Sequence, residues 1–127
     1  MMRKIFTTGA PWESVVGYSR AVRLGDVLEI SGTVAADENG VVARGDHYGQ
    51  TRFILEKIGK VLSDAGFTFE DVVRTRMFVT DISQWEQIGR AHGEVFHTIK
   101  PATSMVEVSR LIDDDYLIEI EVTARKA

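Results

Sequence analysis

The sequence predicts a single α+β domain, a two-layer sandwich in which two helices cover one face of a mixed β-sheet. The chain has 127 residues, enough for one hydrophobic core but not for two, so one domain spans residues 1–127. Two segments carry apolar residues at helical spacing, and five shorter segments carry the alternation or β-branched content of strands. Their order along the chain is ββ-α-β-α-ββ.

The first two strands are predicted over residues 18–24 and 27–33, joined as a hairpin by Gly25-Asp26. A loop punctuated by Gly9, Pro11 and Gly17 precedes them. Residues 34–45 form a turn-rich connection to the next element.

The first helix is predicted over residues 46–65, with Gly66 where a C-terminal cap belongs. A strand follows over residues 72–80, and Asp81 or Ser83 then caps the second helix. One stripe of that helix carries Trp85, Ile88, His92, Val95 and Phe96.

The last two strands are predicted over residues 102–108 and 117–124, and we expect them to pair as a second hairpin. In the final strand Ile118, Ile120 and Val122 point one way, so they face the helices, while Glu119 and Glu121 point the other way.

The predicted register of this hairpin gathers polar residues on the far face of the sheet. If Val108 lies opposite Ile118, with Val106 and Val108 toward the helices, then Met105 lies across from Glu121 and Thr103 lies one diagonal step away.

The strand over residues 72–80 adds Arg74 and Arg76 to this face, because Val73, Met77 and Val79 make the better core set. Two interpretations stay open. Either the face is a partly solvated surface with ion pairs, or another subunit covers it and holds a carboxylate in a cleft.

Composition excludes several classes of function. The formal net charge of −4 argues against a nucleic-acid partner, and the absence of cysteine removes thiolate metal sites, disulfides and thiol nucleophiles. His92 and His97 do not share a helix face, so we expect no metal. No apolar run is long enough for a signal peptide or a membrane span, and we expect a cytoplasmic protein.

Other candidate residues are less specific. No serine sits in a nucleophile-elbow pattern, and Ser31-Gly32 fits a tight packing position. From the residues alone, Trp12 and Tyr18 are favoured as core anchors rather than ligand contacts.

Several separated motifs nevertheless occur in a recognisable order. They are Gly17-Tyr18, Ile30-Ser31-Gly32, Asp71-Val72-Val73-Arg74, Phe78-Val79-Thr80-Asp81, Pro101-Ala102-Thr103-Ser104-Met105-Val106-Glu107-Val108 and Ile118-Glu119-Ile120-Glu121. Over nearly its whole length the chain resembles the YjgF/RidA family of reactive-intermediate deaminases, also called endoribonuclease L-PSP-like proteins.

The resemblance implies a chorismate-mutase-like fold and a homotrimer with three pockets between subunits. Enzymes of the family hydrolyse enamines or imines to ketoacids and ammonia without a cofactor or metal. It also implies that Glu121 holds the attacking water, that Tyr18 and Ser31 line the pocket, and that Met105 stands where cysteine is frequent; Ser104 and Arg76 complete the expected substrate-binding set.

Two positions depart from the family pattern. Thr103 stands where deaminating members have the arginine that binds the substrate carboxylate, and Gly89 stands where asparagine is common. An arginine fork binds a carboxylate bidentately and threonine cannot, so the chain resembles the arginine-lacking members and we expect poor turnover of 2-imino acids.

Two function hypotheses follow. The first is a small-molecule hydrolase of imines, enamines or similar electrophiles, and the second is a non-catalytic binding or sensing trimer that kept the pocket. Arg76 is a candidate replacement for the missing guanidinium. The acidic net charge gives no support to a ribonuclease.

Overall fold

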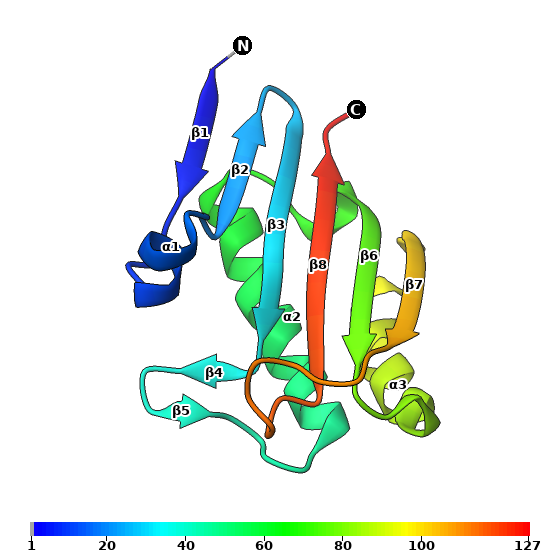
Figure 1. Ribbon diagram of the computed structural model, residues 1–127. Coiled ribbons are helices and arrows are strands. Elements are labelled where there is room, and N and C mark those ends of the chain that lie inside the picture. Colours follow the sequence, from blue (N-terminus) through cyan, green and yellow to red (C-terminus); the bar gives the residue numbers. More distant parts are fainter. Residues whose placement is uncertain (1) are drawn as a thin grey trace.

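The last segment of the chain forms a strand in the interior of the sheet (Figure 1). The computed structural model describes residues 2–127. Its main sheet has six strands in the order β1-β2-β3-β8-β6-β7, and β4 and β5 form a separate small hairpin. The strands are β1 (Arg3–Phe6), β2 (Ala21–Leu24), β3 (Val27–Val34), β4 (Ala36–Asp37), β5 (Gly40–Val41), β6 (Val72–Val79), β7 (Ala102–Glu107) and β8 (Ile118–Arg125).

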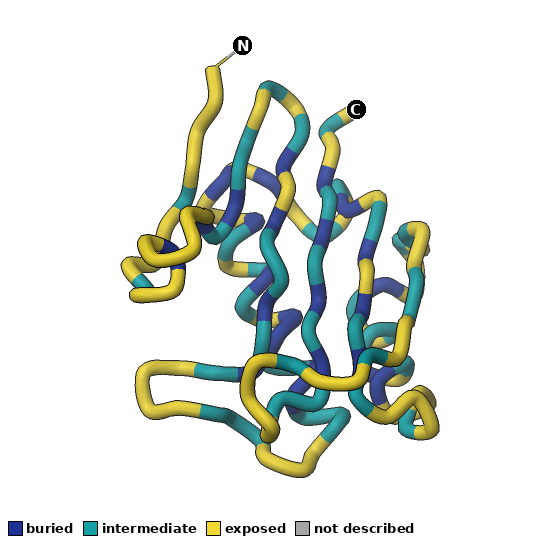
Figure 2. Tube along the Cα trace, in the orientation of Figure 1, coloured by how far each residue is buried: buried dark blue, intermediate teal, exposed yellow. Residues whose placement is uncertain are grey.

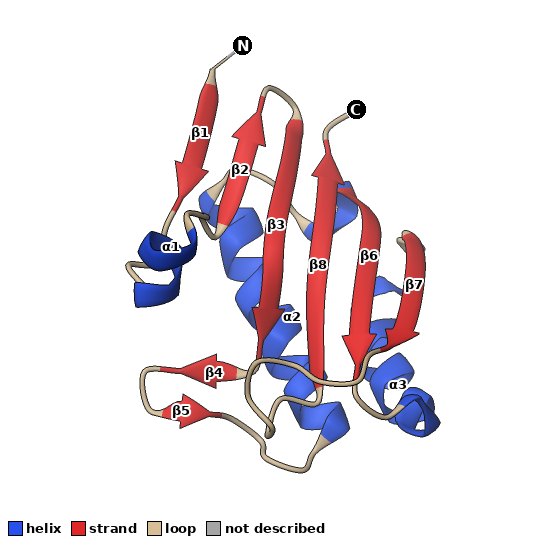
Figure 3. Ribbon diagram, in the orientation of Figure 1, coloured by secondary structure: helices blue, strands red, loops and turns tan. Residues whose placement is uncertain are grey.

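Two long helices, α2 (His47–Asp64) and α3 (Trp85–Phe96), cover one face of this sheet (Figure 3). Single 3-10 turns at Phe69–Asp71 and Ile82–Gln84 precede β6 and α3. The predicted α+β class, with a mixed sheet and two helices on one face, is confirmed.

The N-terminal region holds two elements that the sequence patterns did not predict. The short helix α1 (Pro11–Val16) starts with proline, whose fixed φ suits a first helical position, and ends at Gly17 with φ +88°. Strand β1 has only four residues, three of them exposed, so it has no apolar pattern to detect.

The core lies between the sheet and the two long helices, and β8 contributes every second residue to it (Figure 2). Ile118, Ile120, Val122 and Ala124 are all buried. They pack with residues of α2, of which Ile54, Leu55, Ile58 and Leu62 are the most enclosed.

The ends of α2 agree with the prediction to within one residue. The Asp46 carboxylate accepts a hydrogen bond from the backbone N–H of Gly49 at 2.8 Å, which caps the helix N-terminus. At the other end Gly66 adopts φ +85°, a conformation that glycine takes without steric cost.

The predicted second hairpin is wrong, because β7 pairs with β6 in parallel and β8 lies between β3 and β6. The β6-α3-β7 segment is a crossover unit, in which a helix connects two parallel strands. The connection between β7 and β8 runs across the end of the sheet and is too long for a tight turn.

This pairing also reverses the predicted orientation of β7. Paired residues of neighbouring strands share a face, and Thr103 and Met105 pair with Thr75 and Met77, both of which are buried under the helices. Thr103 and Met105 therefore face the helix layer. Neither lies beside Glu121, and the predicted diagonal contact between Thr103 and Glu121 does not exist within one chain.

The other residues of β7 take the opposite face. Ser104 and Val106 pair with Arg76 and Phe78, and Val106 is 48% exposed although it was expected in the core. The core assignment of Val73 is wrong as well, because an irregularity in the β6–β8 register between Val72 and Arg74 leaves Val73 exposed.

Candidate functional site

The sheet face opposite the two long helices carries charged residues on the adjacent strands β8 and β6. Glu119 and Glu121 of β8 lie on this open face, as predicted, because Ile118 and Ile120 alternate with them and are buried. Arg76 of β6 pairs in register with Glu121. Among residues 2–127 no helix covers this face (Figure 3).

Glu121 is held by an ion pair with Arg76. The distance from Arg76 Nη1 to Glu121 Oε1 is 3.4 Å, and the two side chains are 46% and 37% exposed. Ser104 follows on β7 in register with Arg76, so Glu121, Arg76 and Ser104 form one row across three strands. Glu121 can therefore accept a hydrogen bond from a water or ligand on the open face.

A pocket of about 890 Å³ opens at the C-terminal end of β3, where Glu119 of the neighbouring strand β8 also lines it. Tyr18, Ser31 and Glu119 line it, together with apolar groups from α1 and from the loop before β8. Trp12 and Tyr18 are 58% and 37% exposed and line the pocket, so their assignment as core anchors is wrong. Glu121 and Arg76 do not line the pocket within one chain.

Short hydrogen bonds hold the Tyr18 side of the pocket against β3. Ser31 donates from Oγ to the carbonyl of Ser19 at 2.7 Å and from its backbone N–H to the carbonyl of Arg20 at 3.0 Å. The Arg20 N–H in turn donates to the Phe6 carbonyl at 2.7 Å. The hydroxyl of Ser31 is therefore used to position the segment that carries Tyr18 and Arg20.

Glu119 lies directly over Gly32. A Cβ atom at position 32 would overlap Glu119 Oε2, so a side chain there would force this carboxylate to move. Burial raises the pKa of Glu119, a shift that the nearby Arg20 opposes and Glu121 reinforces. The pocket thus holds a half-buried carboxylate close to a cation.

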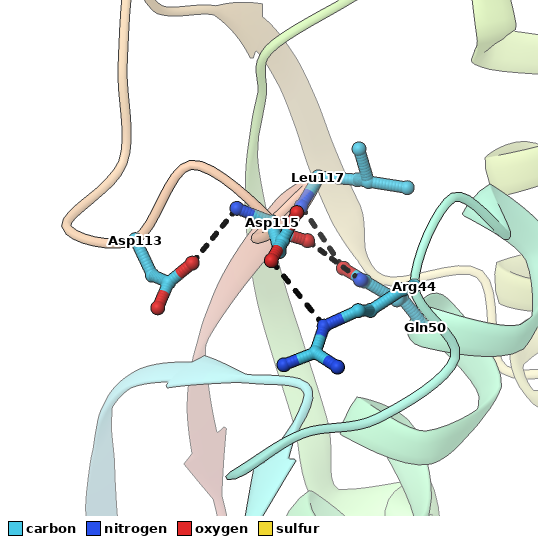
Figure 4. A network of polar contacts seen from close by, with 5 residues as sticks. All are labelled: Arg44, Gln50, Asp113, Asp115 and Leu117. Atoms are coloured by element: carbon cyan, nitrogen blue, oxygen red, sulfur yellow. Dashed lines mark hydrogen bonds and ion pairs between the residues drawn. The ribbon is translucent and has the colours of Figure 1, made fainter.

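The loop between β7 and β8 forms one wall of the pocket through Ile112 and Tyr116. The fully buried Gln50 of α2 holds it, since its side chain donates to the Asp115 carbonyl and accepts from the Leu117 N–H, both at 2.9 Å (Figure 4). Arg44 adds an ion pair to the Asp115 carboxylate at 3.3 Å. These contacts fix the wall to the helix layer.

The helix side of the β7 edge holds a separate polar network. Thr75 Oγ1 contacts His92 Nε2 at 2.9 Å and Thr103 Oγ1 at 2.8 Å, and Thr103 donates to the Pro101 carbonyl. All three contacts are satisfied together when Thr103 donates to that carbonyl, Thr75 donates to Thr103, and His92 donates from Nε2 to Thr75. Burial lowers the pKa of His92.

The other expected residues of this edge lie near the network or within its layer. Met105 packs against the core. On α3, a Cβ atom built on Gly89 would lie 4.0 Å from the Trp85 ring, so a larger residue would fit there without a clash. One chain therefore separates the expected site residues into two groups, Thr103, Met105 and Gly89 on the helix side and Tyr18, Ser31, Ser104, Arg76 and Glu121 on the open face.

Sequence reasoning did not find several polar residues of the pocket, among them Arg20, Lys57 and Tyr116. Neither helix nor strand periodicity marks them. Gln50 also went unnoticed, since a glutamine on an amphipathic helix is ordinarily exposed.

The described residues, 2–127, contain no group of three or more His, Cys, Asp or Glu side chains that could hold a metal ion. Over the same part of the chain, no helix has both the length and the apolar content needed to cross a membrane.

The fold and the open-faced sheet define a known class of small α+β proteins. Residues 7–126 match the family model of Endoribonuclease L-PSP. A RutC family protein of Pyrococcus horikoshii is 38% identical over 127 residues, covering 99% of both chains. A crystal structure of a Mycobacterium tuberculosis member of the YjgF/YER057c/UK114 family is 44% identical, with a TM-score of 0.89 over 98% of this chain and 100% of that one.

The chain therefore belongs to the Endoribonuclease L-PSP family, which is the YjgF/RidA family expected from its motifs. A further relative, the 3-aminoacrylate deaminase RutC of Acinetobacter baylyi, is 36% identical over 108 residues, covering 84% of this chain and 85% of that one. Membership and this similarity support an enamine or imine deaminase-like function in general.

Proposed function

We propose that this protein is a cofactor-independent hydrolase of enamines or imines, acting in the cytoplasm in pockets between the subunits of a homotrimer. The observation that carries the proposal is Glu121, a partly exposed carboxylate fixed on the open sheet face by Arg76 at 3.4 Å. The similarity to a 3-aminoacrylate deaminase supports the reaction class.

In this reaction Glu121 accepts a proton from a water molecule while the water oxygen bonds to the carbon of the C=N group. Glu121 returns this proton to the nitrogen as the C=N π bond breaks, which gives a carbinolamine. The carbinolamine hydroxyl then passes its proton through Glu121 to the nitrogen, the C–N bond breaks to release ammonia, and the oxygen stays on the carbon as a carbonyl. An enamine enters the same sequence after protonation at carbon.

A trimer explains why the expected site residues lie in two groups within one chain. We propose that the edge of β7, with Thr103, Ser104, Met105 and the adjacent Gly89, meets the Tyr18 and Ser31 wall of a neighbouring subunit, and that Arg76 holds the Glu121 carboxylate in place there. Exposed apolar side chains at this edge, such as Val106 at 48% and Trp85 at 55%, support burial against another subunit. Since Thr103 offers no guanidinium, the substrate is other than a standard 2-imino acid bound at that position.

The test is ammonia and carbonyl release from freshly generated 3-aminoacrylate and 2-iminopropionate, the second of which we expect to react poorly, comparing the parent with Glu121→Gln. Glutamine keeps the shape but cannot take the proton, so we expect a loss of at least about 100-fold in kcat/KM with the trimer mass by light scattering unchanged. Activity within about threefold of the parent would remove Glu121 from the mechanism, and a monomer would remove the shared pocket.

Thr103 and Gly89 favour a second candidate, a trimer that binds a small molecule without transforming it. The same assay separates the two functions. A parent protein that binds small carboxylates yet releases no ammonia from either substrate supports the binding protein.

A further inference from the structure

We propose that Arg20 binds the anionic group of the ligand in the pocket and that Glu119, on the other side of Gly32, contacts the nitrogen of the same ligand. The ligand class is then a small carboxylate with an amino or imino nitrogen. This inference deepens the proposed function and relies on it only for the use of the pocket as the ligand site.

The first observation is that Arg20 is a half-buried cation without a carboxylate partner. Five ion pairs occur among residues 2–127, all between groups with substantial exposure, and Arg20 belongs to none of them. Its Nη2 donates to the Gly32 carbonyl, while Nε is buried with no hydrogen-bond partner in that same range. A guanidinium has five N–H donors, and buried charges are ordinarily paired.

The second observation is that Arg20 is positioned rather than free. Its backbone N–H and carbonyl are both hydrogen-bonded, to Phe6 and to Ser31. The Nη2 contact with Gly32 then fixes the far end of the side chain beside the pocket wall. A cation held in place before the ligand arrives loses little conformational entropy on binding.

Two other cations, one lining the pocket and one in the charged row, are already engaged. Lys57 lines the pocket, but its ammonium donates to the carbonyls of Val34 and Ala36 at 3.1 and 2.9 Å. Arg76 neutralises Glu121 and does not line the pocket. Arg20 is therefore the cation best placed to receive an anion.

Glu119 gives the site its second specificity element. The Glu119 carboxylate lies where a side chain of Gly32 would be, and the Arg20 guanidinium donates to the carbonyl of the same glycine. The two charged groups therefore lie on either side of Gly32 and do not form an ion pair with each other. A ligand that carries a carboxylate and an N–H donor satisfies both groups at once. A ligand with only a carboxylate gains from Arg20 and meets repulsion from Glu119.

The experiment is an NMR titration of the assembled parent protein with three unreactive probes, β-alanine, propionate and propionamide. We expect β-alanine to bind more tightly than propionate, and propionamide most weakly. Arg20→Gln should weaken β-alanine and propionate by about ten-fold or more, because a charge-assisted bidentate contact is lost. Glu119→Gln should weaken β-alanine alone.

Arg74→Gln is the matched control, since Arg74 lies on β6 outside the pocket. It should leave all three affinities unchanged. Arg20→Lys should retain part of the propionate affinity, which separates charge from local packing if Arg20→Gln assembles poorly. Equal propionate binding by the parent and either Arg20 variant overturns the proposal, as does a parent that does not distinguish propionate from propionamide.

These titrations require no turnover, so their outcome is independent of the hydrolysis assay. Loss of hydrolysis in Glu121→Gln with unchanged β-alanine binding leaves both proposals standing. Arg20-dependent binding in a protein without activity supports this inference and contradicts the proposed hydrolase.

Discussion

Alternate residues of β8 lie in two environments. Ile118, Ile120 and Val122 are almost fully buried under α2 and α3, whereas Glu119 and Glu121 lie on the open face with partners that are charged or half-exposed. The buried set packs in the hydrophobic core and stabilises the fold. The open set carries charges that solvent screens, so it contributes little to stability.

Along β8, residues that stabilise the fold therefore alternate with residues that we propose act on the ligand. A substitution on one side of β8 should change the free energy of unfolding, and a substitution on the other side should change ligand binding or activity. Three predictions test this separation, beginning with the largest expected effect.

The largest effect is expected at Ile120, which is fully buried between Met77 and Thr33 in the centre of the sheet. Ile120→Ala removes three carbon atoms and leaves a cavity, so the free energy of unfolding should fall by about 2–5 kcal/mol. Urea unfolding followed by circular dichroism measures it. Glu121→Gln, the adjacent position, should change stability by less than about 1 kcal/mol. Equal losses at both positions would contradict the separation.

Strand β8 also shows which parts of the fold could be predicted from the sequence. The strict alternation of Ile118 to Glu121 determined which residues face the helices, and that prediction is correct. Strand β7 offers no such pattern, because Val106 and Val108 on one parity compete with Met105 on the other. The structure resolves the choice through the parallel pairing of β7 with β6, which depends on the α3 crossover and not on local alternation.

The site was predicted less completely than the fold, for the same reason. Tyr18 and Ser31 were found through their motifs, and they line the pocket. The approach of Arg20 and Glu119 to Gly32 joins segments far apart in the chain, and no spacing rule places them together. The buried contact of Gln50 with the loop before β8 is of the same kind.

An intermediate effect is expected at His92, the titratable group of the helix layer. Burial holds the pKa of His92 below its ordinary value of 6.5, so the unfolded chain binds the proton more tightly. Its stabilising contribution is complete above about pH 7.5 and is lost as the pH falls through about 6.5 toward the folded-state pKa. His92→Gln should flatten that part of the stability profile.

The measurement is the midpoint of urea unfolding between about pH 5 and 7.5 for the parent and His92→Gln. His97→Gln serves as the control, because His97 is exposed at the end of α3 and has no comparable buried environment. An identical slope in the parent and His92→Gln would show that other groups produce the acid sensitivity.

The smallest effect is expected for the ion pair between Arg76 and Glu121, and it defines what the open face contributes to folding. Both side chains are more than a third exposed, so solvent screens their attraction and a double-mutant cycle with Arg76→Gln and Glu121→Gln should give about 0.2–1 kcal/mol. The same two variants should differ sharply in the hydrolysis assay, since Glu121 takes the proton in the proposed reaction and Arg76 only holds it in place.

A coupling energy above about 2 kcal/mol would mean that the pair is desolvated in the assembled protein. The coupling should also weaken with added salt if the face is wet, and it should resist salt if neighbouring subunits exclude water from the pair. Measuring the cycle at low and high salt therefore tells whether the open face of one chain is a solvated surface or an interface.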